Sequence, residues 1–65
     1  MKILVNGTEK KIQAETIQAL IPALGLIPET SLVEHNGIAL HRNEWKDHTL
    51  SEGDKIEILQ ISAGG

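Results

Sequence analysis

The chain has 65 residues and a formal net charge of −3 at neutral pH, with no cysteine and one aromatic residue, Trp45. A domain of this length buries only about 60% of the surface that its unfolded chain exposes, which leaves no room for an enclosed active site. The absence of cysteine excludes disulfides, thiolate zinc sites and a cysteine nucleophile. Acidic charge and scarce aromatic residues argue against nucleic acids and anionic membranes and favour basic protein surfaces as partners.

The first predicted element is a β-hairpin. Asn6-Gly7 separates the apolar run Lys2–Val5 from a second segment, Glu9–Gln13, and Asn-Gly is the strongest short signal for a two-residue hairpin turn. The apolar run is too short for the apolar core of a signal peptide, and no other run approaches the length of a membrane span. We therefore expect a cytoplasmic protein.

A short helix is predicted next. Apolar residues recur at helical spacing from Ile17 to Leu24, Thr16 can act as the N-cap, and Gly25 suits the C-terminal stop. Pro22 removes one hydrogen bond and clashes with the preceding turn. The helix is therefore expected either to kink or to end early.

A second hairpin follows a loop at Leu26–Thr30. Its strands, Ser31–His35 and Ile38–His41, flank a second Asn-Gly pair, Asn36-Gly37. The next segment, Arg42–His48, is polar around Trp45 and is expected to form an irregular or single-turn connection.

A turn and a last strand complete the predicted elements. Ser51–Asp54 is rich in turn residues, so Gly53 and Asp54 are expected to shape a turn. Lys55–Ile61 reads as the last strand. Trp45 is expected to pack over the small core rather than to bind a ligand.

The order hairpin, helix, hairpin and strand predicts an α+β fold of the β-grasp (ubiquitin-like) type, a small mixed sheet with one helix packed across one face. In this architecture the last strand lies centrally, beside the first. We expect a β-grasp domain over residues 1–61 and a flexible tail over residues 62–65.

The tail ends in Gly64-Gly65. Because glycine has no Cβ, such a tail can thread a narrow channel and leave its last carbonyl open to attack. Four extended residues, Ser62, Ala63, Gly64 and Gly65, reach at most roughly 14 Å beyond the domain. This arrangement is what a carboxyl-terminal carrier requires.

A set of residues along nearly the whole chain carries a family resemblance: Val33-Glu34-His35-Asn36-Gly37, Arg42, Trp45, Gly53-Asp54 and Ile61-Ser62-Ala63-Gly64-Gly65. With these residues the chain resembles the ThiS-type sulfur carriers of thiamine biosynthesis, which are ubiquitin-like proteins related to the small subunit of molybdopterin synthase. Pro22 in the helix is less usual for this pattern.

The resemblance implies a protein co-substrate rather than an enzyme. A ubiquitin-activating-like adenylyltransferase would use ATP to convert the Gly65 carboxylate to an acyl-adenylate, and sulfur from a cysteine desulfurase or another donor would then give a thiocarboxylate. Thiazole synthase would consume that sulfur. Activation is needed because an ionised carboxylate is a poor electrophile. The carrier itself is expected to bind no cofactor, since ATP is used by the activating partner.

The last strand also suggests a docking surface. Ile56 and Ile58 point to one face, where we expect them to pack under the helix with Ile3 and Val5. We expect the other face to present an exposed docking patch made of Leu4, Glu57, Leu59 and Ile61.

The remaining polar residues carry weaker signals. His35, His41 and His48 show no metal-ligand spacing, so we expect them to face solvent and assign no metal site. The acidic residues are scattered along the chain, and no pair stands out for acid–base catalysis.

Three alternatives stay open from the sequence. The chain could be the small subunit of molybdopterin synthase or another sulfur carrier, which shares the chemistry but not the partner. It could be a β-grasp interaction domain with a chance Gly-Gly end. It could also be a protein modifier that forms isopeptide bonds through Gly65.

Overall fold

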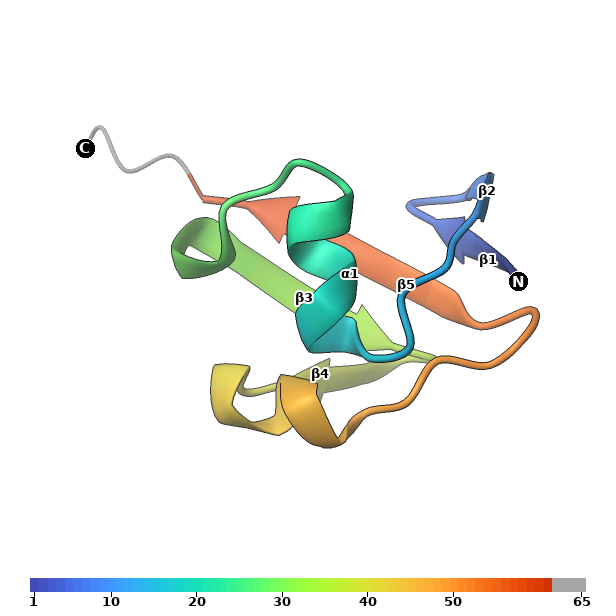
Figure 1. Cartoon of the computed structure of the whole chain (residues 1–65). Coiled ribbons are helices and arrows are strands. Elements are labelled where there is room, and N and C mark those ends of the chain that lie inside the picture. Colours follow the sequence, from blue (N-terminus) through green and yellow to red (C-terminus); the bar gives the residue numbers. More distant parts are fainter. Residues whose placement is uncertain (62–65) are drawn as a thin grey trace.

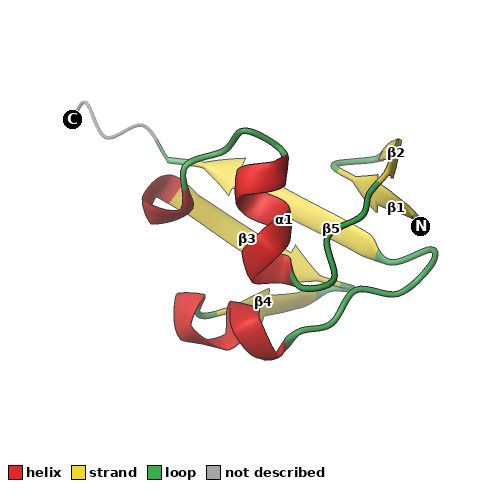
Figure 2. Ribbon diagram, in the orientation of Figure 1, coloured by secondary structure: helices red, strands yellow, loops and turns green. Residues whose placement is uncertain are grey.

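The computed structural model describes residues 1–61. One sheet and one α-helix form the framework of this part of the chain (Figures 1 and 2). The strands are β1 (Lys2–Val5), β2 (Thr8–Lys11), β3 (Ser31–His35), β4 (Ile38–Leu40) and β5 (Lys55–Gln60). The helices are α1 (Ile17–Ala23) and two short 3-10 helices, η1 (Pro28–Thr30) and η2 (Arg42–Asp47).

The sheet is mixed, with the strand order β2-β1-β5-β3-β4. β1 pairs with β5 in parallel, and the other neighbouring strands are antiparallel. The predicted β-grasp architecture is confirmed, including the central position of the last strand beside the first. Figure 1 shows α1 lying across one face of the sheet.

Both Asn-Gly pairs form the predicted hairpin turns. Asn6 and Asn36 each have φ of 51°, and Gly7 and Gly37 have φ of 82° and 85°. Positive φ at both central residues defines the turn type whose twist matches two antiparallel strands, and Asn followed by Gly tolerates it best. The register of both hairpins is therefore fixed locally.

The helix begins and ends as its sequence predicts. The Thr16 side chain accepts a hydrogen bond from the Ala19 backbone N–H, which caps the N-terminus. At the other end, Gly25 has φ of 76°, and the Leu26 N–H donates to the Ile21 carbonyl oxygen. This pattern closes the last turn. Pro22 lies inside the helix, which runs past it to Ala23 with Leu24 as the C-cap, so Pro22 does not end the helix before the stop at Gly25.

The core lies between α1 and the sheet. The largest fully buried side chains are Ile3, Ile17, Leu20, Ile21 and Ile56. Ile58, Val5, Val33, Leu50 and Trp45 complete most of it. The predictions that Ile56 and Ile58 pack with Ile3 and Val5, and that Trp45 is a packing residue, are confirmed.

Two segments are more regular than expected. The loop predicted at Leu26–Thr30 contains η1, which starts at Pro28, a residue whose fixed φ suits the first position of a helical turn. The connection predicted at Arg42–His48 is the 3-10 helix η2. Within residues 1–61 the structure contains no helix long and apolar enough to cross a membrane.

Candidate functional site

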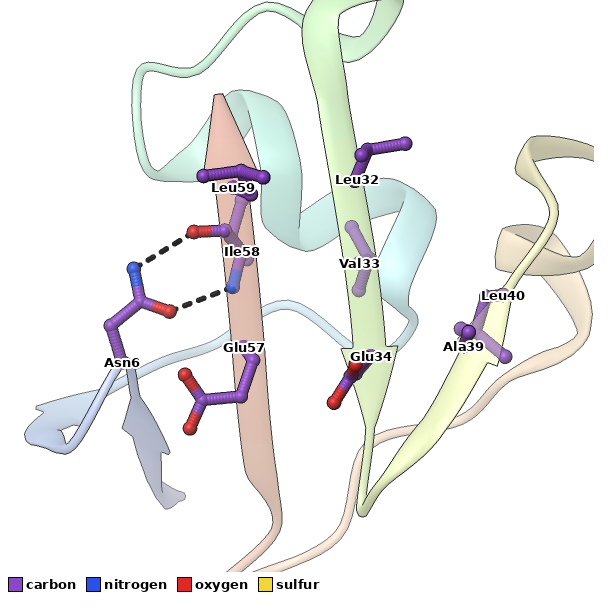
Figure 3. A pocket seen from close by; sticks show the side chains of 9 residues that line it. All are labelled: Asn6, Leu32, Val33, Glu34, Ala39, Leu40, Glu57, Ile58 and Leu59. Carbon is purple, nitrogen blue, oxygen red and sulfur yellow. Dashed lines mark hydrogen bonds between the residues drawn. The ribbon is translucent and has the colours of Figure 1, made fainter. Parts of the chain in front are cut away.

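The open face of the sheet, opposite α1, carries a shallow groove over β5, β3 and β4. Figure 3 looks onto this face, with the helix behind the sheet. The groove is lined by Asn6, Leu32, Val33, Glu34, Ala39, Leu40, Glu57, Ile58 and Leu59. We call this surface the open-face groove.

Two apolar side chains stand out on this face. Leu32 and Leu59 are opposite each other in the β3–β5 register, and their exposed fractions are 51% and 64%. Exposed leucines that occur singly are ordinary, but a cross-strand pair beside a groove forms a contiguous apolar patch. Such a patch is typical of a protein-binding surface.

Two carboxylates lie next to that leucine pair. Glu34 and Glu57 are directly opposite each other on β3 and β5, an arrangement that destabilises a sheet because like charges face each other. Among the ion pairs of residues 1–61, neither carboxylate has a basic partner. The face therefore combines an apolar patch with uncompensated negative charge.

Asn6 holds β5 at the edge of the groove. Its Oδ1 accepts a hydrogen bond from the Ile58 N–H at 2.7 Å, and its Nδ2 donates to the Ile58 carbonyl oxygen at 3.0 Å (Figure 3). The regular β1–β5 register extends as far as Val5 opposite Ile56. The Asn6 side chain thus continues the pairing of β5 beyond the end of β1.

The structure brings together only part of the predicted docking patch. Glu57 and Leu59 line the groove, and Ile61 is exposed just beyond the end of β5. Leu4 is half-buried and lies opposite Lys55, about 13 Å along β5 from Leu59 at the rise of a strand. It does not join the groove.

Sequence reasoning missed the contribution of β3 to this face. Leu32 and Glu34 alternate along β3 with the buried Ser31, Val33 and His35. That alternation is visible in the sequence. Their position beside Leu59 and Glu57, however, depends on the β3–β5 register, which joins segments far apart in the chain.

The prediction that all three histidines face solvent is wrong for His35. This residue is 9% exposed, because it follows Val33 on the helix-facing side of β3. Its Nε2 lies 2.7 Å from Asp54 Oδ2, and its Nδ1 lies 3.1 Å from His48 Nδ1. Only one proton can be shared between the two Nδ1 atoms, so the contact requires one ring to donate and the other to accept.

Asp54 does more than shape its turn. Its side chain accepts hydrogen bonds from the Asn36 side chain and the Ser51 N–H and pairs with His35. Burial acts to raise the pKa of Asp54, but the hydrogen bonds and the histidine together hold the pKa below its ordinary value of 3.8. The carboxylate therefore ties the start of β5 to the β3–β4 turn.

The tail predicted to carry the chemistry, Ser62–Gly65, lies outside the described residues. Within residues 1–61, no group of three His, Cys, Asp or Glu side chains is arranged to hold a metal ion. The described part of the chain presents the open-face groove and ends at residue 61, where the predicted tail begins.

Comparison with known proteins gives a family match along nearly the whole chain. The model of the ThiS family matches residues 3–65. A crystal structure of a thiamine biosynthesis protein (ThiS) from Geobacter metallireducens has a TM-score of 0.82 and 33% identity, and the match covers 100% of both chains. A solution structure of a thiamine biosynthesis protein from the same organism has a TM-score of 0.80 and 33% identity, over 100% of this chain and 88% of that one.

Two relatives are larger proteins, each named thiazole synthase. The one from Paramagnetospirillum magneticum is 32% identical over 66 aligned positions, and the one from Magnetococcus marinus is 35% identical over 66. Both alignments cover 100% of this chain but 20% of the relative. The chain thus spans about a fifth of the length of the curated relatives it matches.

Proposed function

The chain belongs to the ThiS family, and from this premise we propose that it is a sulfur carrier of thiamine biosynthesis that acts as a protein co-substrate rather than as an enzyme. The observation that carries the proposal is the family match over residues 3–65, which includes the glycine pair. A fold that matches a thiamine biosynthesis protein over its full length supports it.

We propose Gly65 as the residue that is modified. In the first step a Gly65 carboxylate oxygen attacks the α-phosphorus of ATP, pyrophosphate leaves, and an acyl-adenylate forms. In the second step sulfide attacks the carbonyl carbon, the bond to AMP breaks, and a thiocarboxylate remains after loss of a proton. The two steps consume ATP and sulfide and involve no change of oxidation state. Ser62, Ala63, Gly64 and Gly65 form the arm that delivers the terminal group.

The open-face groove is the proposed docking surface for the activating adenylyltransferase. Its exposed Leu32 and Leu59 offer apolar contact, and the unpaired Glu34 and Glu57 fit a partner that presents arginine or lysine beside an apolar surface. Docking here fits the proposed delivery of the tail because the groove borders the C-terminal end of β5, which the tail follows.

We further propose thiazole synthase as the protein that consumes the sulfur. Proteins with that name contain a region similar to this chain, and such a combination within one polypeptide supports an association between the two parts. Sulfide is the sulfur source in this scheme; a cysteine desulfurase, which delivers sulfur as a persulfide, would supply it together with a thiol that acts as the two-electron reductant. The reaction takes place in the cytoplasm, and ATP is bound by the activating partner rather than by the carrier.

A reconstituted reaction tests the chemistry. The purified chain is incubated with ATP, sulfide and the adenylyltransferase of the same organism, and the C-terminal peptide is examined by mass spectrometry. We expect adenylate on Gly65 without sulfide and thiocarboxylate with it. A chain lacking Gly65 is the control and should give neither product. An unmodified carboxylate on the full chain would overturn the proposal and favour an interaction domain.

The docking surface is tested separately by Leu59→Asp. Because Leu59 is 64% exposed, the variant should fold like the original chain. A charged side chain at the centre of an apolar contact should raise the KM for adenylation about tenfold or more. An unchanged KM in a folded variant would show that the groove is not the docking surface.

A further inference from the structure

The C-terminal end of β5 is tied to the segment before β3 by a chain of hydrogen bonds. The Ile61 N–H donates to the Thr30 carbonyl oxygen at 2.7 Å. The Thr30 hydroxyl lies 3.2 Å from Gln60 Oε1, and Gln60 Nε2 donates to Ser31 Oγ. Ser31 Oγ in turn donates to the Ile27 carbonyl oxygen at 2.8 Å. We call Gln60, Thr30 and Ser31 the tail-base clasp.

The clasp lies on the opposite side of the sheet from the open-face groove. Side chains alternate along β5, and Ile56 and Ile58 are buried on the helix-facing side. Gln60 follows Ile58 by two residues and so points to the same side as Ile56 and Ile58, whereas Glu57 and Leu59 point to the open face. The bonds from Gln60 to η1 and the start of β3 agree with this placement. Gln60 is therefore not part of the proposed docking contact.

We propose that Gln60, with Thr30 and Ser31, is a positioning residue that fixes where the carrier tail leaves the domain; the inference rests on the proposed function. With the clasp closed, residue 61 is held by its backbone bond to Thr30, and the tether to the reacting carboxylate is four residues long. With the clasp open, the backbone bond of Ile61 is weakened and Ile61 joins the tether, which lengthens to five residues, while Gln60 stays in β5 opposite Ser31.

The length of the tether sets how often the carboxylate meets the bound ATP. Effective concentration falls roughly as the −3/2 power of tether length, so a change from four to five residues lowers it about 1.4-fold. A tail that leaves the domain in varying directions lowers the rate further, since misplacing a reacting group by about 1 Å can reduce a reaction rate by much more than this. We expect a reduction in turnover of about two- to tenfold, without weaker docking.

Steady-state adenylation kinetics of Gln60→Ala test the inference. Pyrophosphate release is measured with ATP and the activating adenylyltransferase at increasing carrier concentration. We expect kcat to fall about two- to tenfold and KM to stay within about twofold. A kcat equal to that of the original chain would overturn the inference, as would a raised KM with unchanged kcat, which would make Gln60 a docking residue.

Variants of Thr30 separate positioning from a general loss of structure. Thr30→Val keeps the shape but removes the hydroxyl that contacts both Gln60 and the Ile27 carbonyl oxygen, so it should lower kcat, whereas Thr30→Ser keeps the hydroxyl and should keep the original kcat. Gln18→Ala is the matched control, since it truncates an exposed glutamine on α1, and should leave both constants unchanged. Equal kcat for the valine and serine variants would contradict the clasp.

Amide hydrogen exchange gives a readout that does not depend on activity. The Ile61 amide should exchange faster in Gln60→Ala than in the original chain, because its hydrogen bond to the Thr30 carbonyl oxygen then opens more often. Unchanged exchange would overturn the clasp even if kcat falls. If the original chain is not adenylated at all, the proposed function fails; if it is adenylated and Gln60→Ala matches it, only this inference fails.

Discussion

The two faces of β5 differ in what their side chains contact. On the helix-facing side, Ile56 and Ile58 are 0% and 9% exposed. On the other side, Leu59 is 64% exposed and Glu57 faces Glu34 across the sheet. One face stabilises the fold, while the other keeps apolar and like-charged side chains that contribute little or are unfavourable to stability. This contrast supports the proposal that the open face binds a partner.

The largest expected effect comes from a substitution on the helix-facing side of β5. Ile56→Ala should lower the free energy of unfolding by about 2–5 kcal/mol, because it removes buried methyl groups and leaves a cavity. Leu59→Ala is the matched control on the same strand and should change it by no more than about 0.5 kcal/mol. Urea unfolding at neutral pH measures both. Equal losses for the two variants would contradict the assignment of faces.

The next effect concerns the edge of the open-face groove. Asn6→Asp keeps an acceptor for the Ile58 N–H but replaces the donor to the Ile58 carbonyl with a second oxygen. The unfolding free energy should fall by about 1–3 kcal/mol. Asn43→Asp makes the same chemical change at an exposed position of η2 and serves as control. A loss for Asn6→Asp no larger than that of the control would show that Asn6 does not hold β5.

A smaller effect depends on pH and lies at the other end of β5. The pKa of Asp54 is lowered in the folded state, so its carboxylate stabilises the fold above its ordinary pKa, and this contribution is lost as the pH falls through the folded-state value. Asp54→Asn should cost about 1–2 kcal/mol at pH 7. The difference from the original chain should shrink below pH 3.8. Urea unfolding at several pH values tests this, and a difference independent of pH would contradict the lowered pKa of Asp54.

The smallest expected effect sharpens the contrast between the faces. Glu34→Gln removes the repulsion with Glu57 and should raise the unfolding free energy by up to about 0.5 kcal/mol. The same change should weaken binding to the activating adenylyltransferase, because it removes charge from the groove. Calorimetry of unfolding and of binding gives both values. If the variant gains stability and binds as tightly as the original chain, the carboxylates do not contribute to the proposed contact.

Local signals in the sequence predicted most of the fold. Each Asn-Gly pair defines its own hairpin, and Thr16 and Gly25 define the ends of α1, because turns and caps depend on a few neighbouring residues. Alternation along Lys55–Ile61 was sufficient to assign Ile56 and Leu59 to opposite faces.

Features that depend on long-range register were not predicted. Leu32 joins Leu59 only because β3 pairs with β5, and Leu4 stays apart because β1 meets β5 near Lys55. His35 is buried because it lies on the helix-facing side of β3, where His48 and Asp54 form hydrogen bonds with it. No local pattern in the sequence records these pairings.

The central claim, that the chain carries sulfur on Gly65, is tested most directly on protein taken from its own cells. The protein is treated with a thiol-selective alkylating reagent, and its C-terminal peptide is examined by mass spectrometry. Because the chain has no cysteine, alkylation reports a thiocarboxylate; in the mass of the intact protein it also separates this group from oxidation of Met1, which adds nearly the same mass. We predict an alkylated peptide that ends at Gly65. A peptide that stays unalkylated, even after incubation with ATP, sulfide and the adenylyltransferase, would contradict the account.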